Sequence, residues 1–163
     1  MKNVLKLGLA AVAISALAAC GGGDSSEATD AYVGTWKSAC YVRSVTNQTG
    51  TFYTKRIRSN TKVSATELAS SYTYDNIYSD AACAVPWGTW SNNSPITGKY
   101  VFGAKAQFLG AAADTYVYND TATPATTYTG YMVATGNQIF IADALTGSAP
   151  PTSWSSTSPY TKQ

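Results

Sequence analysis

The chain has 163 residues, no histidine, and a formal net charge of +2 from 11 basic and 9 acidic residues. This length is enough for one domain with a hydrophobic core. Without histidine, the chain cannot form a Ser-His-Asp or Cys-His catalytic group, and a zinc site would have no imidazole ligand. We therefore expect a protein that is not an enzyme and that needs no cofactor or metal ion.

Residues 1–19 are predicted to be a secretory signal peptide. Lys2 and Lys6 give a basic start, and residues 7–19 are apolar or small, with Ser15 as the only hydroxyl. A short basic start before an apolar segment is typical of an export signal. The apolar segment is shorter than the roughly 20 residues that a membrane-spanning helix needs.

The end of this segment, Leu17-Ala18-Ala19-Cys20, resembles the lipobox of bacterial lipoproteins. The resemblance implies that the chain is cut before Cys20, which then carries a diacylglycerol and a further acyl chain. One acyl chain binds a membrane only marginally, whereas two or three make stable anchoring plausible. Gly21 stands where an aspartate often signals inner-membrane retention, so the resemblance implies the outer membrane, facing the periplasm or the cell surface. The alternative is an ordinary signal peptide followed by an unrelated cysteine.

Residues 20–31 are expected to form a flexible, lipidated tether, because their glycines, serines and acids bury little apolar surface. Removing Lys2 and Lys6 with the signal leaves nine basic and nine acidic residues, so the charge indicates no partner. The remaining cysteines are Cys40 and Cys83. Export to an oxidising compartment favours a disulfide between them over free thiols. Such a bond is worth roughly 3–4 kcal/mol.

Residues 32–163 are predicted to form one β domain, because abundant threonine and tyrosine suit half-buried strands. Turn signals divide this region into about eight strands. The expected strands are residues 32–42, 51–59, 62–77, 87–91, 96–109, 115–119, 126–135 and 138–145. We also expect a tight turn at Asn60-Thr61 and an irregular tail from about residue 147, pinned to the domain by Trp154 or Tyr160.

Alternation within two of these strands predicts a buried face. Trp36 and Cys40 share one face of the first strand. The clearest apolar stripe of period two lies in residues 96–109, where one face carries Tyr100, Phe102, Ala104, Ala106 and Phe108. We expect both faces to line the core.

Short strands with few residues for helices between them must close into a barrel or stack as a sandwich. We expect an all-β fold with a single antiparallel barrel of about eight strands, and a β-sandwich as the alternative. Gly34-Thr35-Trp36, repeated as Gly88-Thr89-Trp90, resembles the Gly-X-Trp signature of lipocalins. The resemblance implies a lipocalin-like barrel in which the tryptophan plugs one end. Bacterial lipocalins can also carry an amino-terminal lipid and a disulfide.

Two function classes follow from this fold. One is a binding module that takes a small apolar or amphipathic ligand into a pocket bounded by Trp36, Tyr100, Phe102 and Phe108. The other is a structural or protein-interaction lipoprotein of the cell envelope with a filled core. Small barrels can be either hollow or filled, so both classes stay open.

The chain has one basic cluster, made of Lys55, Arg56, Arg58 and Lys62. Its two arginines share one strand face and Lys55 takes the other. We expect a solvated face that protects a sheet edge, rather than a site for nucleic acid, glycan or lipid headgroups. No nucleic-acid partner is predicted.

The remaining candidates are aromatic and acidic side chains. Tyr72, Tyr74 and Tyr78 recur at even spacing, and we expect them to fill the interior rather than to line a ligand cavity. Glu67 could form a catalytic carboxylate pair with Asp75 or with Asp80. Their spacing fixes no common face, so we expect isolated surface acids.

Overall fold

The computed structural model describes residues 29–44, 49–88, 94–121 and 125–163. The predicted signal peptide, Cys20 and most of the predicted tether lie outside the described residues. Within the described ranges, no helix has the length and apolar character needed to cross a membrane.

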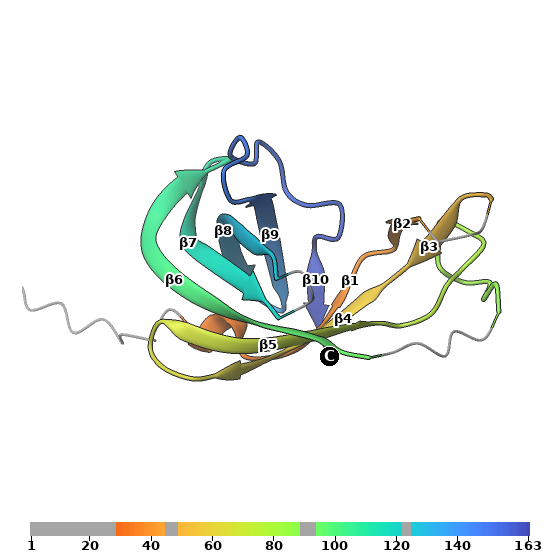
Figure 1. Cartoon of the computed structure of the whole chain (residues 1–163), viewed down its shortest axis with the longest axis horizontal. Coiled ribbons are helices and arrows are strands. Elements are labelled where there is room, and N and C mark those ends of the chain that lie inside the picture. The colour runs from red at the N-terminus through yellow and green to blue at the C-terminus, as the bar shows by residue number, and fades with distance from the viewer. Residues whose placement is uncertain (1–28, 45–48, 89–93, 122–124) are drawn as a thin grey trace, which may run out of the picture.

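The chain forms a closed antiparallel barrel of eight strands, which confirms the predicted fold class (Figure 1). Barrel strands that follow one another in the chain are hydrogen-bonded neighbours, and the first also pairs with the last. A 3-10 helix, η1 (Asp30–Tyr32), precedes them. The barrel strands are β1 (Gly34–Ser38), β4 (Arg56–Lys62), β5 (Glu67–Tyr74), β6 (Ile96–Phe108), β7 (Ala111–Asp120), β8 (Thr127–Thr135), β9 (Gln138–Leu145) and β10 (Tyr160–Lys162).

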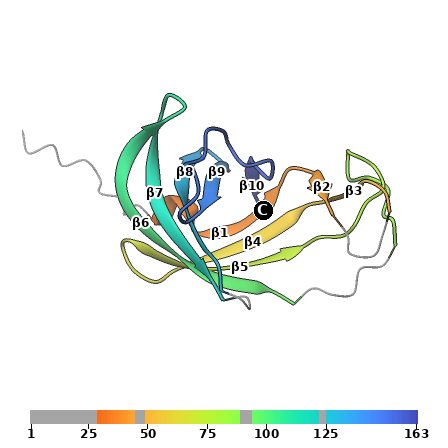
Figure 2. The same cartoon turned by 45° about the horizontal axis from the view of Figure 1, so that its top comes forward.

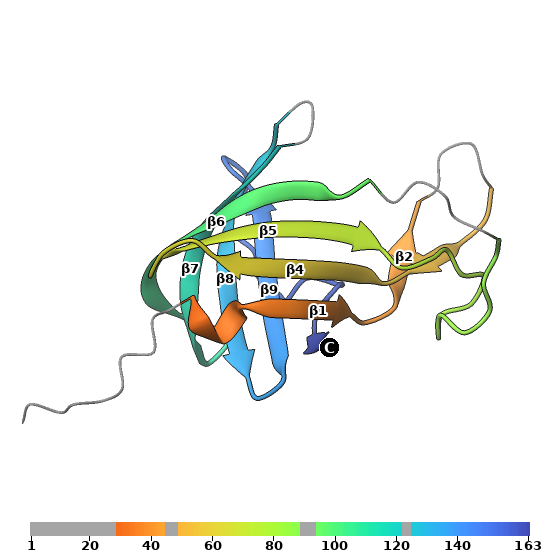
Figure 3. The same cartoon turned by 90° about the horizontal axis from the view of Figure 1, so that it is seen from below.

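A small lobe extends from the end of the barrel opposite η1 (Figures 2 and 3). In this lobe β2 (Tyr41–Arg43) and β3 (Phe52–Thr54) form a two-stranded sheet. The loop of residues 75–88 packs beside the sheet through a β-bridge between Tyr78 and Tyr53. We call these segments the lobe.

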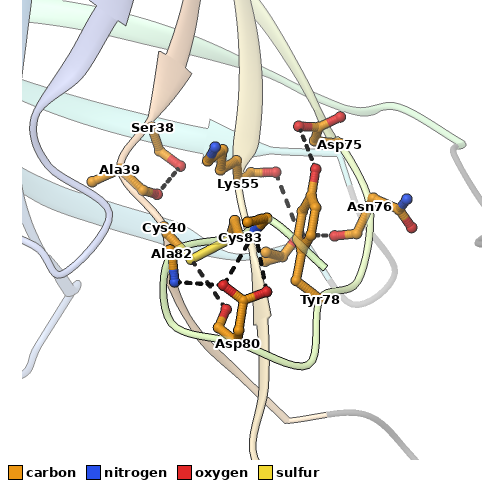
Figure 4. Close-up of a disulfide and its surroundings, with 12 residues drawn as sticks. Ser38, Ala39, Cys40, Lys55, Asp75, Asn76, Tyr78, Asp80, Ala82 and Cys83 are labelled. Atoms are coloured by element: carbon orange, nitrogen blue, oxygen red, sulfur yellow. Dashed lines mark hydrogen bonds between the residues drawn. A yellow bond between two sulfur atoms is a disulfide. The ribbon is translucent and has the colours of Figure 1, made fainter. Parts of the chain in front are cut away.

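The predicted disulfide is present (Figure 4). It joins Cys40, directly before β2, to Cys83 in the loop of residues 75–88. The Asp80 carboxylate tightens the loop that carries Cys83, because it accepts backbone N–H bonds from Val85, Ala84 and Ala82 at 2.6–3.2 Å. These bonds, that of Val85 first, lower the pKa of Asp80. The lobe is therefore held by one covalent bond and one ordered loop.

Three predicted features of the first strands are wrong. Residues 32–42 are not one strand, because β1 pairs with β10 only as far as Ser38 and the chain then leaves the barrel. Cys40 therefore lies beyond the strand and does not share the buried face of Trp36. Asn60-Thr61 is not a turn but part of β4, where the Asn60 amide donates to the Tyr32 carbonyl oxygen at 3.0 Å.

The tail is irregular from residue 147, as predicted, but it ends in β10, which closes the barrel. Both predicted anchors hold it. Tyr160 is fully buried in the main core. Trp154 packs outside the barrel against Phe108 and Phe140, with ring centroids 4.9 and 5.7 Å apart.

A bulge in β6 interrupts the predicted apolar stripe. Between the pairs Phe102–Tyr116 and Lys105–Asp114, β6 advances three residues while β7 advances two. The extra residue reverses the alternation, so that later side chains change face. Phe108 therefore joins Ala113 and Trp154 in a separate outer cluster and does not lie with Tyr100 and Phe102 in the core.

Aromatic packing fills the end of the barrel next to η1, which we call the closed end. The Tyr32 hydroxyl donates to Asp114 Oδ2 at 2.6 Å and lies 3.0 Å from the Met132 carbonyl oxygen. The Trp36 indole N–H donates to the Tyr32 carbonyl oxygen at 2.9 Å. Trp36 thus plugs this end, and the polar atoms of both rings have partners.

Candidate functional site

The structure brings together three of the four residues predicted to bound a pocket. Trp36, Tyr100 and Phe102 belong to one buried cluster, but Phe108 lies outside the barrel. Tyr100 stacks on Phe102 with centroids 6.0 Å apart, and Phe102 stacks on Tyr32 at 5.1 Å. The predicted apolar pocket is therefore occupied by these rings themselves.

A cavity of about 290 Å³ lies at the other end of the barrel, beside the lobe. We call it the mouth. Its wall is mainly polar and consists of Tyr41, Val42, Arg56, Arg58, Tyr72, Tyr100, Tyr118, Tyr128, Asp143, Ser155, Ser156 and Thr157. Inward-facing positions of the barrel strands supply most of this wall, while β2 and the tail cover its rim.

Arg58 is the deepest charged side chain in the mouth. It lies on β4 opposite Trp36 on one side and Tyr72 on the other. The residue is only 3% exposed, and its Nε and Nη1 atoms have no hydrogen-bond acceptor among the described residues. Its guanidinium carbon lies 5.2–5.8 Å from the ring centroids of Tyr72, Tyr100, Tyr118 and Tyr160. A cation therefore sits in an aromatic cage with N–H donors unused.

Arg56 stands two residues nearer the rim on the same face. Its guanidinium carbon lies 4.5 Å from the Tyr72 ring centroid and 5.8 Å from that of Tyr74, and its Nε has no acceptor among the described residues. Burial works against its charge, but the surrounding tyrosines, Tyr160 first, raise the pKa of Arg56. The group is therefore charged at every physiological pH.

The tyrosines of the mouth are neutral phenols. Burial raises the pKa of Tyr118 and of Tyr41 to about 12, even though nearby Arg58 and Arg56 respectively oppose the shift. Neither hydroxyl donates a hydrogen bond to any described residue. Both phenols can therefore donate a hydrogen bond to a ligand.

The mouth carries more positive than negative charge. Neither Arg56 nor Arg58 forms an ion pair with any described residue, whereas the lysines at positions 37, 99 and 105 each pair with an acid. The acid in the lining, Asp143, is exposed. In the described part of the chain, no three His, Cys, Asp or Glu side chains gather as a metal site would require. This wall suits an anion.

A larger hollow of about 450 Å³ lies on the outer face of β6–β8, roofed by Pro150 and Pro151. No charged side chain lines it, and none of its lining residues has a buried polar side-chain atom without a partner. The mouth is smaller but contains unsatisfied, buried charge. We therefore regard the mouth as the candidate site.

The expectation that Arg56 and Arg58 form a solvated strand face is wrong, because both point into the barrel. The prediction that they share a face, with Lys55 on the other, is correct. A usable signal was present: Arg56, Arg58 and Asn60 alternate, as do Tyr72 and Tyr74 on the next strand. Tyr72 and Tyr74 do face inward. However, Tyr72 lines the mouth, whereas we expected it to fill the interior without lining a cavity.

Comparisons with known proteins give no relative. No family model matches the chain, and neither the curated proteins nor the solved structures contain a match to it. The function is therefore argued from the geometry of the mouth.

Proposed function

We propose that this protein is a lipid-anchored envelope lipoprotein that binds a small anionic ligand in the mouth of its barrel. The observation that carries the binding proposal is Arg58, which is almost fully buried, lacks an ion pair, and leaves two nitrogen atoms unbonded among the described residues. Lipid anchoring rests on the resemblance of residues 17–20 to a lipobox.

Burial of a lone guanidinium is costly, because the effective desolvation penalty is about several kcal/mol per ion. Cation–π contacts with four tyrosines offset part of this cost, at about 0.5–2 kcal/mol each. They do not satisfy the N–H donors, which need oxygen or nitrogen acceptors in line. An anion bound beside Arg58 would supply both charge and acceptors, which explains why the chain keeps this arrangement.

The placement of the mouth fits a binding role in an anchored protein. The described chain starts at the closed end, next to η1, and the lobe lies at the opposite end (Figure 3). The mouth lies beside the lobe, since Tyr41 and Val42 of β2 line it. A tether from the closed end would direct the mouth away from the membrane that holds the lipid. The ligand would then be exchanged with the aqueous side and not with that membrane.

A second candidate is a protein-interaction role, favoured by apolar side chains exposed on the lobe. Val42, Val85 and Trp87 are 63%, 56% and 49% exposed. Exposed apolar groups that gather on one surface often mark an interaction site. This role is compatible with ligand binding, since Val42 also touches the mouth.

Native mass spectrometry of the full chain, extracted from the envelope in detergent, tests the binding proposal. We expect a bound small anion in the wild-type protein and its loss in Arg58→Met. An identical adduct in both proteins would place the ligand elsewhere and refute the proposed site. In parallel, Cys20→Ser should move the protein out of the membrane fraction, and unchanged fractionation would refute the lipid anchor.

A further inference from the structure

The mouth offers hydrogen-bond donors in excess. Five buried atoms of its lining have no partner among the described residues, namely Arg58 Nε and Nη1, Arg56 Nε, and the hydroxyl oxygens of Tyr41 and Tyr118. All five belong to groups that are donors when the arginines are charged and the phenols neutral. A suitable ligand must therefore present many acceptors in a small volume.

The two guanidinium groups also have one neighbour in common, the ring of Tyr72. Both stand over the same Tyr72 ring, with guanidinium carbons 4.5 and 5.7 Å from its centroid. Together they place two positive charges at this ring, and no described acid forms an ion pair with either. One compact group with a charge near −2 would balance them.

We propose that the anionic group bound in the mouth is a phosphoryl group, carried by a small phosphate monoester. This inference rests on the proposed anion-binding function and names its chemistry. A phosphate monoester presents three acceptor oxygens and about −1.5 to −2 charges at neutral pH. A carboxylate presents two oxygens and one charge, so it would leave donors and one guanidinium unmatched.

The size of the mouth favours an ester over free phosphate. A volume of about 290 Å³ is near the lower end of small-molecule pockets, and tyrosine rings form much of its wall. A phosphoryl group at Arg56 and Arg58 would leave room toward the rim for a small organic body. That body would contact Tyr72 on β5 and Tyr128 on β8, which both line the mouth.

Isothermal titration calorimetry with four probes tests the proposal, using the full chain in detergent at pH 7.5. The probes are phenyl phosphate, benzenesulfonate, benzoate and phthalate, which differ in charge and in the number and geometry of acceptor oxygens. We expect phenyl phosphate to bind about tenfold or more tighter than benzoate, because each added hydrogen bond to a charged group is worth about that factor. Inorganic phosphate and vesicles containing phosphatidic acid then distinguish the source of the group, and we expect weaker binding for both.

The pH dependence gives a second measurement. The second ionisation of a phosphate monoester has a pKa of about 6, so affinity for phenyl phosphate should fall from pH 7.5 to pH 5.0. Benzoate affinity should stay level in that range. The chain has no histidine to titrate there, and the carboxyl groups around the mouth tyrosines are Asp120 and Asp143. The same profile in Asp143→Asn assigns it to the ligand.

Two variants separate failure of this inference from failure of the proposed function. Arg58→Met should weaken phenyl phosphate binding about 10–100-fold. Lys55→Met removes an equal charge beside Arg56 but outside the lining, where Lys55 faces the Tyr78 ring, and should leave binding unchanged. If benzoate or phthalate binds as tightly as phenyl phosphate and still depends on Arg58, the mouth binds anions but the phosphoryl assignment is wrong. If no probe binds, or if Arg58→Met changes nothing, both proposals are wrong.

Discussion

Both ends of the barrel bury aromatic side chains that carry polar atoms, and they differ in how those polar atoms are satisfied. At the closed end the hydroxyl of Tyr32 and the indole N–H of Trp36 both have acceptors within 3.0 Å. At the mouth, Tyr118 and Arg58 are nearly as buried, but their hydroxyl and guanidinium donors lack acceptors among the described residues. Burial alone therefore does not distinguish the closed end from the candidate binding end.

This difference suggests separate roles for the two ends: the closed end contributes to stability, and the mouth is the candidate binding site. A buried polar group with its partner contributes to stability, whereas one without a partner costs about 1–3 kcal/mol. Natural proteins break this rule mainly at functional sites. We therefore expect substitutions at the closed end to reduce stability, and comparable substitutions at the mouth to affect ligand binding while leaving stability unchanged or improved.

The largest expected effect is at Trp36, which is 1% exposed. Trp36→Ala should lower the free energy of unfolding by about 3–5 kcal/mol, because it removes a buried ring and leaves a cavity. Urea denaturation followed by circular dichroism measures this. Tyr72→Ala, in the half-buried wall of the mouth, is the matched control and should cost clearly less. Equal losses at both positions would contradict the division between the two ends.

The next largest loss of stability is expected when the disulfide between Cys40 and Cys83 is removed. Replacing both Cys40 and Cys83 by serine should lower the free energy of unfolding by about 2–4 kcal/mol, because the unfolded chain regains the freedom of a long loop. It should also weaken ligand binding, since Tyr41 follows Cys40 directly and lines the mouth. Thermal melting with and without reductant measures the first effect, and the double variant should not respond to reductant. A wild-type melting temperature that is insensitive to reductant would argue against the bond.

Two tyrosine hydroxyls provide the sharpest comparison. Tyr32→Phe should cost about 1–3 kcal/mol, because it removes the donor to Asp114 and leaves that buried carboxylate under-satisfied. Tyr118→Phe removes a hydroxyl without a partner among the described residues and should be neutral or slightly stabilising. Urea denaturation of both variants checks this. A larger loss for Tyr118→Phe would reverse the assignment of the two ends.

Arg58→Met should raise the free energy of unfolding by on the order of 1 kcal/mol, because an apolar side chain of similar length removes the burial of an unpaired charge. The same variant should lose ligand binding. Urea denaturation without ligand gives the stability change. A loss of several kcal/mol would instead mean that the tyrosine cage holds Arg58 for structural reasons.

A further effect is expected at alkaline pH. Burial raises the pKa of Tyr41 and Tyr118 to about 12, compared with about 10 in an unfolded chain. The folded protein therefore holds these protons more tightly. The resulting stability is fully present below pH 10 and is lost as the pH rises toward 12. Melting temperatures from pH 8 to 11.5 should fall above pH 10, and less steeply in Tyr118→Phe; a level profile would contradict the shifts.

Prediction from the sequence succeeded where the signal lay within one stretch of the chain, or where only one pairing was possible. Short strands without intervening helices led to the barrel, and two cysteines in a domain predicted to be exported led to the Cys40–Cys83 bond. The structure contains both features. The strands at residues 96–109 and 138–145 were located within one residue of β6 and β9. The lipid anchor on Cys20 stays a prediction.

Prediction failed where the extent of a strand, or the direction of its side chains, depended on the neighbouring strands. The alternation that placed Phe108 inside assumed a regular strand, and the bulge against β7 reversed it. Asparagine favours turns, which predicts a turn at Asn60. In the structure its side-chain amide instead donates to the Tyr32 carbonyl oxygen and accepts from the Ser70 hydroxyl. The pairing of β4 with β1 and β5 likewise determines that the face carrying Arg56 and Arg58 is the inner one.

The sequence by itself determined the fold class, the disulfide and, within regular strands, which side chains share a face. These depend on composition, on the number of cysteines and on the period of two. Only the tertiary structure decided which of the two faces becomes the interior. That choice depends on the register with which β4 pairs with β1 and β5, and this register places Arg58 between Trp36 and Tyr72. The candidate binding site follows from that register, since a shift of one residue would turn both arginines out to solvent.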